Sequence, residues 1–190
     1  MLASASPARL RLLRDAGLAP HVRVSGVDES TVTGSAAEQV LALARLKATA
    51  VARLEPGALV LGCDSLLELD GEALGKPASA AEAITRWDAL RGRSATLLTG
   101  HCLIETATAR TVAEVESTVV HFGRPTDREV AAYVASGEPL QVAGAFTLDG
   151  RSAAFIERIE GGAGNVIGLS LPLLRALLRR LQVELVDLWC

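Results

Sequence analysis

Aromatic residues are scarce in this chain of 190 residues, at 3% of the sequence. Proteins that stack single-stranded nucleic acid on their surface need aromatic faces, so this shortage argues against that class. Basic residues are not in excess either, because 22 acidic residues outnumber 19 lysines and arginines and give a formal net charge of −3. A general nucleic-acid binder, or a protein of anionic membranes, would have a basic surface. Any site for an anion must therefore be a local cluster of cations.

Cysteine is also rare, since Cys63, Cys102 and Cys190 form no close pair and lack the spacing of metal ligands. This favours a reduced protein without disulfides or a zinc site. No stretch is long and apolar enough to span a bilayer, and the first residues do not have the pattern of a secretion signal. We therefore expect a cytoplasmic protein that binds neither membrane nor nucleic acid.

Hydrophobic residues are plentiful, at 49% of the sequence, so the chain can bury a substantial core. Its length predicts a single, bilobed domain over residues 1–190. Apolar periodicity and capping residues predict helices over residues 7–16, 36–54, 80–90, 127–136 and 173–181. Strands are expected over residues 1–4, 21–25, 58–63, 66–69, 95–108, 111–122, 145–148, 154–159 and 183–188. Helices that alternate with strands and hairpins predict an α/β fold with a mixed sheet.

Two short segments point to chemistry. Val60 to Cys63 form an apolar run that ends on Asp64, where an unpaired carboxylate would be unfavourable. Shortly afterwards Lys76 stands between Gly75 and Pro77, and a proline favours an extended conformation in the residue before it. An acid at a strand end and a cation on a rigid turn are typical of sites for phosphorylated ligands. The alternatives are a backbone-capping aspartate and a surface lysine.

Four other residues could belong to the same site. Ser6 caps a helix whose first turn contains Arg9, and a helix start with an arginine suits phosphate oxygens. Glu29 follows Asp28 on a loop, where paired acids can hold a divalent cation. Lys47 lies on the helix over residues 36–54. Each of these has a purely structural alternative. Ser6 and Arg9 could be an ordinary helix cap with a solvated arginine, Glu29 could lie in a solvated turn, and the stem of Lys47 could simply cover apolar surface.

Taken together, these residues provide what an enzyme acting on triphosphates needs. Arg9, Lys47 and Lys76 are cations for phosphates. The acids for a metal are Glu29, Asp28 or Asp64, and Asp64 could activate water. A second interpretation is a non-catalytic protein that holds a nucleotide, or a partner related to cell division, in the same cleft. The joint presence of Glu29, Asp64 and Lys76 favours the enzyme.

The chain resembles the Maf family of nucleoside triphosphate pyrophosphatases. The resemblance rests on motifs that occur in the family's order, namely Leu2-Ala3-Ser4-Ala5-Ser6-Pro7-x-Arg9, Val27-Asp28-Glu29, Lys47-Ala48, Gly62-x-Asp64, Gly75-Lys76-Pro77, Thr99-Gly100, Ala143-Gly144-Ala145-Phe146 and Asn165-Val166-Ile167-Gly168-Leu169. It covers nearly the whole chain.

The resemblance implies an elongated mixed β-sheet flanked by helices, with two lobes and a central cleft, as in the inosine triphosphatases. It also implies hydrolysis of a nucleoside triphosphate to the monophosphate and pyrophosphate with Mg²⁺ or Mn²⁺, in the removal of modified or surplus nucleotides, with a suggested link to arrest of cell division. A homodimer is expected from the resemblance alone. The family's catalytic base corresponds to Asp64, and its phosphate and metal residues correspond to Ser6, Arg9, Glu29, Lys47 and Lys76.

Three positions depart from the branch of the family that acts on dTTP and UTP. That branch has arginine, threonine and glutamine where this chain has Ala8, Ser65 and Asp149. Another branch, which prefers 7-methyl-GTP, has an acid near Asp149, and an acid can accept hydrogen bonds from a guanine edge. Ser65 and Asp149 are therefore candidates for base specificity, and the preferred base stays open.

Overall fold

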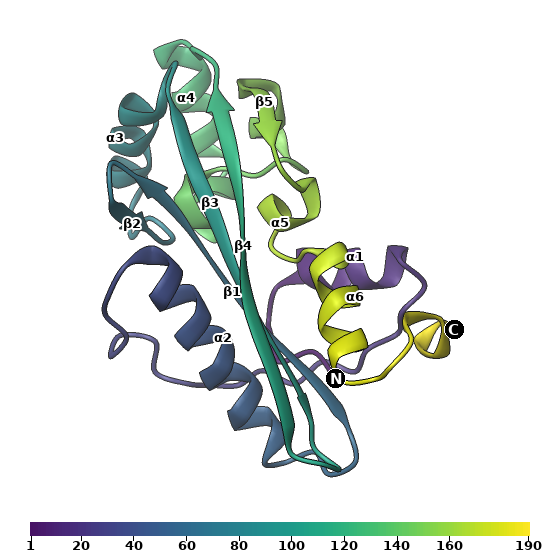
Figure 1. The fold of residues 1–190 in the computed structure, drawn as a ribbon. Helices are drawn as coiled ribbons and strands as arrows, with labels where there is room; N and C mark the ends of the chain where they lie inside the picture. The colour runs from purple at the N-terminus through teal and green to yellow at the C-terminus, as the bar shows by residue number, and fades with distance from the viewer.

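The computed structural model describes residues 1–190 and is built around three long strands. Its sheet has the order β2-β1-β3-β4-β5, and every neighbouring pair in it is antiparallel. The strands are β1 (Leu59–Leu69), β2 (Glu72–Leu74), β3 (Ser94–Glu105), β4 (Arg110–Phe122) and β5 (Ile156–Glu160). Parallel pairing is confined to isolated bridges from Leu2 to Val22 and to Leu61. The expected α/β fold, with a sheet flanked by helices, is confirmed (Figure 1), but apart from these bridges the sheet is antiparallel and not mixed.

The helices begin where the sequence places capping residues. They are α1 (Pro7–Asp15), α2 (Ala36–Ala52), α3 (Ala80–Leu90), α4 (Asp127–Ala135), α5 (Ala163–Ile167) and α6 (Leu171–Arg180). Ser35 and Thr126 form reciprocal capping boxes with Glu38 and Glu129, which satisfy main-chain N–H groups at both ends of the box. None of the helices combines the length and the apolar character that a membrane span requires.

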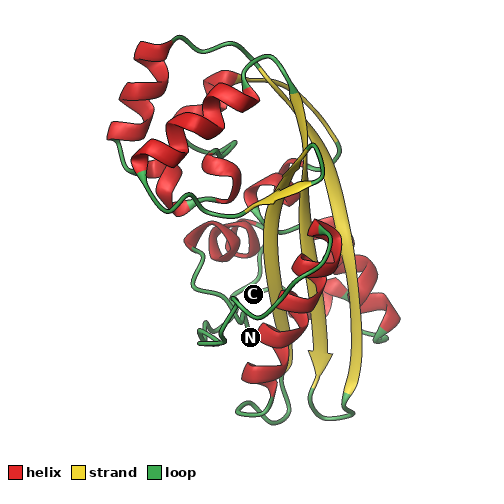
Figure 2. Cartoon of the chain, turned by 90° about the vertical axis from the view of Figure 1, so that its left-hand side faces the viewer, coloured by secondary structure: helices red, strands yellow, loops and turns green.

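The helices cover the two faces of the sheet differently. Helix α2 packs on one face, where Ala44, Ala48 and Val51 meet Val60 and other small side chains of β1 and β3. The opposite face carries one apolar cluster at each end. At one end lie α3 and α4, and at the other lie α1 and α6, as Figures 1 and 2 show along the length of the strands.

Polar residues separate these two clusters on the sheet. Along β1, Leu61 and Cys63 belong to one cluster and Leu67 belongs to the other, and Ser65 lies between them. Along β3, Thr99 and His101 interrupt the apolar run in the same way, between Leu97 and Leu103. Because side chains alternate between faces along a strand, Asp64 lies on the α2 face and Ser65 on the other.

Four predicted strands are wrong or reduced. Residues 145–148 and 183–188 were expected to be strands, but the structure has the 3-10 helices Ala143–Ala145 and Leu185–Leu188 there. In the first segment Ala145 has a positive φ angle, and Phe146 is extended but belongs to no strand. In the second, only Trp189 forms a β-bridge, with Leu18, and the partly buried Leu185 and Leu188 pack on an apolar cluster. The predicted strands over residues 1–4 and 21–25 are reduced to isolated bridges at Leu2 and Val22.

Asp64 does not end its strand. The predicted strands over residues 58–63 and 66–69 are one strand of 11 residues, β1, and Asp64 lies in its middle opposite Gly100 of β3. The ladder with β3 continues on both sides of the acid, so its main chain needs no turn there. Asp64 therefore reaches its neighbours across the face of the sheet and not from its edge.

Candidate active site

Two glycines allow α2 to rest directly on the sheet. A Cβ atom at Gly62 of β1 would lie 2.3 Å from the carbonyl oxygen of Ala44, and one at Gly100 of β3 would lie 2.2 Å from that of Val40. Real side chains do not approach backbone so closely, so only glycine permits this packing. Lys47, almost one turn after Ala44, is thereby brought over Asp64.

Lys47 joins two carboxylates. Its Nζ lies 2.6 Å from Oδ1 of Asp64 and 2.8 Å from Oε1 of Glu29. The side chains of Lys47 and Asp64 are 11% and 12% exposed, whereas that of Glu29 is 54% exposed. Burial of an unpaired charge is unfavourable, so Lys47 and Asp64 each provide the partner that the other needs inside the protein. The alternative of a lysine that only covers apolar surface is excluded.

This cluster meets the chemical requirements of a hard divalent cation in part. Carboxylate oxygens of Glu29 and Asp64 converge on one positive group, and Mg²⁺ is commonly held by one or two carboxylates together with phosphates of the substrate. The chain has no group of three or more His, Cys, Asp and Glu side chains that could hold a metal by itself. The two acids thus suit a cation that is shared with a phosphorylated ligand.

Arg9 is built into the opposite face of β1. Its guanidinium donates to the carbonyl oxygens of Gly168 at 2.7 Å and Cys63 at 2.9 Å, and to the hydroxyls of Ser4 at 3.1 Å and Ser65 at 2.9 Å. These bonds use four of its five N–H groups. The alternative of a solvated arginine is therefore wrong, because Arg9 is buried. At most one N–H is left for a ligand, although the whole positive charge remains.

Ser6 is an N-cap, as the sequence predicts. Its hydroxyl accepts a hydrogen bond from the main-chain N–H of Arg9 at 3.4 Å. Its own N–H donates to the hydroxyl of Ser4 at 3.2 Å, and that hydroxyl also accepts from the Arg9 side chain. Ser6 and Arg9 are thus brought together at the start of α1.

Four further polar residues complete this buried network. Thr99 and Asn165 stand in motifs quoted from the sequence but were given no role there, and His101 and Ser170 were not assigned to a site. The Ser65 hydroxyl lies 2.9 Å from that of Thr99, which donates to the carbonyl oxygen of Asn165 at 3.0 Å. His101 lies beside them and accepts a hydrogen bond at Nε2 from Ser170, the N-cap of α6, at 2.9 Å. Thr99 and His101 interrupt an otherwise apolar strand, which is the sequence signal that could have identified them.

Burial also acts on the ionisable groups near this network. It lowers the pKa of His101 to about 4, and the nearby positive charge of Arg9 adds to this effect. It raises the pKa of the Cys63 thiol to about 12, despite the opposing influence of Arg9. Cys63 is therefore a protonated, apolar residue and not a nucleophile.

The two remaining predicted residues lie apart from these clusters. Lys76 is exposed in the loop that follows β2, and its side chain makes no ion pair or hydrogen bond within the protein. Asp149 is exposed and forms an ion pair with Arg11 of α1. The structure thus joins Glu29, Lys47 and Asp64 on one face of β1 and Ser6, Arg9 and Ser65 on the other.

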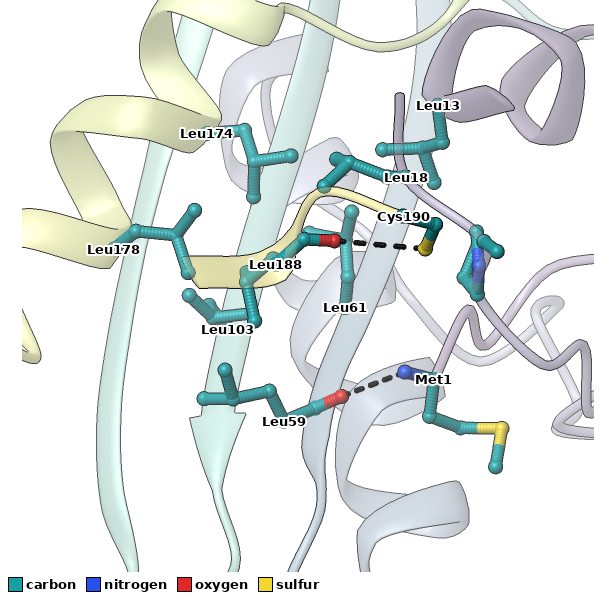
Figure 3. Close-up of a pocket in the computed structure, with 12 residues that line it drawn as sticks. Met1, Leu13, Leu18, Leu59, Leu61, Leu103, Leu174, Leu178, Leu188 and Cys190 are labelled. Carbon is teal, nitrogen blue, oxygen red and sulfur yellow. Dashed lines mark hydrogen bonds between the residues drawn. The ribbon is translucent and has the colours of Figure 1, made fainter. Parts of the chain in front are cut away.

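The pocket drawn in Figure 3 lies at the other end of β1 from Lys76. It is lined by 12 residues, 11 of them hydrophobic, among them Leu61, Leu103 and Leu178. None of the predicted site residues lines it. Its volume of about 180 Å³ is part of the apolar region between α1, α6 and the chain ends.

Comparisons with known proteins identify the same family over nearly the whole chain. A family profile described as "Maf-like protein" matches residues 1–181. The "Nucleoside triphosphate pyrophosphatase" of Streptomyces coelicolor is 65% identical, with 100% of this chain and 93% of that protein covered. Proteins of the same name from Streptomyces avermitilis and Thermosynechococcus vestitus are 62% and 55% identical, and the alignments cover 100% and 98% of this chain and 93% and 96% of those proteins.

Among solved structures, the chain is similar to the Ham1 protein of Staphylococcus aureus. The similarity covers 64% of this chain and 70% of that chain, with 21% sequence identity and a TM-score of 0.43. A structural similarity this low says nothing about the functional site.

Proposed function

The chain belongs to the Maf-like protein family, and from this we propose that it hydrolyses nucleoside triphosphates to the nucleoside monophosphate and pyrophosphate. The observation that carries the proposal is the cluster in which Lys47 joins Glu29 and Asp64. A protein that only binds nucleotides needs cations for the phosphates. It does not need a buried carboxylate held by a lysine at the same place, whereas water activation does.

Asp64 is the proposed general base. Its Oδ1 accepts from Lys47, whereas Oδ2 makes no hydrogen bond within the protein and can take a proton from water. The water oxygen then attacks the α-phosphorus, its bond to phosphorus forms, and the bond from the α-phosphorus to the bridging oxygen breaks. The electron pair leaves with pyrophosphate, and the proton stays on Asp64 until solvent removes it.

Cations stabilise the negative charge that develops in this step. Lys47 holds Asp64 in place and adds positive charge, and Arg9 and Lys76 are the proposed partners of the phosphate oxygens, with Ser6 at the positive end of α1. Glu29 and Asp64 would hold Mg²⁺ or Mn²⁺, which neutralises phosphate charge when bound. Of the two candidates for base specificity, Asp149 remains the one for reading the base, whereas Ser65 is bonded to Arg9 and lies beside Thr99, and we expect it to act through Arg9.

The test is a product assay over a panel of nucleotides that includes dTTP, UTP, GTP and 7-methyl-GTP, with Mg²⁺ or Mn²⁺. We expect monophosphate and pyrophosphate in equal amounts, and in ¹⁸O-labelled water the label should appear in the monophosphate. Label in pyrophosphate would place the attack on the β-phosphorus. Tight nucleotide binding without products from any member of the panel would favour the non-catalytic alternative.

A further inference from the structure

Lys76 is the only proposed phosphate ligand that no protein side chain holds. It lies on an exposed loop, residues 75–79, between β2 and α3, and its ammonium group has no partner in the protein. A flexible lysine on a mobile loop would contribute little, because groups that bind a transferring phosphate must be held near their working position. The main chain on either side of Lys76 therefore decides whether this residue can act.

Arg86 of α3 holds the loop before Lys76. Its Nη1 donates to the carbonyl oxygen of Gly75, and the same oxygen accepts from the main-chain N–H of Gly144 at 3.0 Å. The Arg86 side chain is only 11% exposed, although the helix that carries it lies at the surface. An arginine buried to this extent and directed at a main-chain carbonyl is part of the structure of the loop and not a solubilising charge.

Glu82 holds the loop after Lys76. Its Oε2 accepts a hydrogen bond from the main-chain N–H of Ala78 at 2.7 Å, and its Oε1 forms an ion pair with Nη2 of Arg86, one turn along α3. The bond from Ala78 is the main reason that the pKa of Glu82 is lowered, with Arg86 adding to it. Ser79 caps α3 by accepting from the N–H of Glu82 at 3.2 Å.

We propose that Arg86 and Glu82 form a clamp that positions Lys76 for the phosphates of the substrate. The two side chains bind each other, and each binds the main chain on one side of the Lys76-Pro77 dipeptide. Pro77 is buried, which leaves the clamped loop little freedom at that residue. The clamp acts through Lys76, so both residues are positioning residues, and the inference rests on the proposed function.

The test is a double-mutant cycle on pyrophosphate release. Arg86→Met keeps the apolar stem and removes the donors, and we expect kcat/KM to fall by about tenfold to a hundredfold, as for a displaced substrate-binding group. Lys76→Ala should lower it by a similar factor. In the double variant the loss should be no larger than that of Lys76→Ala alone, because a clamp without its lysine has nothing to position.

The control is Arg93→Met, which removes an exposed arginine paired with Asp70 just after α3 and should leave kcat/KM unchanged. Thermal unfolding shows whether each variant is folded. Should Arg86→Met fail to fold, Glu82→Gln, which removes the charge but keeps an acceptor, takes its place in the cycle. Losses that multiply in the double variant, or a folded Arg86→Met enzyme with normal kinetics, would overturn the clamp. Because wild-type activity is measured in the same assay, failure of the clamp is distinct from failure of the proposed reaction.

Discussion

The ammonium group of Lys47 lies 2.6 Å from the Asp64 carboxylate, and both side chains are almost fully buried. They come from different elements, α2 and β1, and this close packing of α2 on the sheet requires that Gly62 and Gly100 have no side chain. Glu29 completes the group from a loop at 2.8 Å. Two carboxylates on one cation leave the cluster negative, which suits a further cation, and the second oxygen of Asp64 makes no hydrogen bond within the protein.

Replacing Asp64 by asparagine should remove activity and keep the fold. Asparagine still offers Lys47 an acceptor oxygen, but it cannot take a proton from water, so kcat should fall by at least about 10²- to 10³-fold. Pyrophosphate release and thermal unfolding measure the two properties. Glu68→Gln, on the same strand, is the matched control. A variant with near-normal turnover would mean that Asp64 is not the base.

Gly62→Ala should displace α2. The new methyl group would lie 2.3 Å from the Ala44 carbonyl oxygen and 2.7 Å from the Ala48 nitrogen, so the helix must move away from β1. We expect the free energy of unfolding to drop by about 1–3 kcal/mol, as for overpacked cores, and Lys47 to lose its contact with Asp64. Urea unfolding measures this loss. Gly75→Ala, whose methyl group would meet only Leu66 at 3.6 Å, should change stability far less.

Ser65→Ala should weaken the enzyme towards all nucleotides alike. The Ser65 hydroxyl accepts from Arg9 and lies 2.9 Å from the Thr99 hydroxyl, so its loss leaves a buried donor unpaired, at about 1–3 kcal/mol of stability. Activity on each nucleotide should fall by the same factor, because the effect passes through Arg9. Ser117→Ala, at an exposed position of β4, is the control. A changed ratio between pyrimidine and purine substrates would instead support Ser65 as a specificity residue.

Stability should decrease in mild acid because of His101. Burial lowers its pKa to about 4 in the folded protein, whereas an ordinary imidazole has a value of 6.5. Between these values only the unfolded chain binds the proton. The free energy of unfolding therefore falls as the pH drops from about 6.5 to 4, by at most about 3 kcal/mol. Above pH 6.5 the imidazole is neutral in both the folded and the unfolded chain, so this loss of stability is absent.

Urea unfolding at pH values from 4.5 to 8 tests this, with His101→Gln beside the wild type. In this variant the free energy of unfolding should depend much less on pH below pH 6.5, because glutamine does not titrate. His21→Gln, at an exposed position, should keep it. An unchanged slope in His101→Gln would assign the acid sensitivity to other groups.

Local signals were sufficient for most elements of the fold. Caps such as Ser35 and Thr126, each followed three residues later by a glutamate, predict helix starts correctly, because a capping box involves only neighbouring residues. Residues 183–188 show the limit of such signals. Their alternating apolar pattern suits a strand, but a strand also needs a partner with free N–H and C=O groups, and the only β-bridge there joins Leu18 to Trp189.

The sequence by itself determined the chemistry available to this protein. The residue types at Asp64, Lys47, Glu29 and Arg9 follow from the order of amino acids alone. The place of Asp64 and Ser65 inside one strand, on opposite faces of the sheet, does not, because the sequence predicts a strand that ends before Asp64. Only the tertiary structure decided which of these charges meet. Lys47 is 17 positions before Asp64 and Gly168 is 159 positions after Arg9, and their contacts exist because packing brings distant elements within hydrogen-bond distance. Burial then makes each pairing necessary, since charges removed from water must find partners inside the protein.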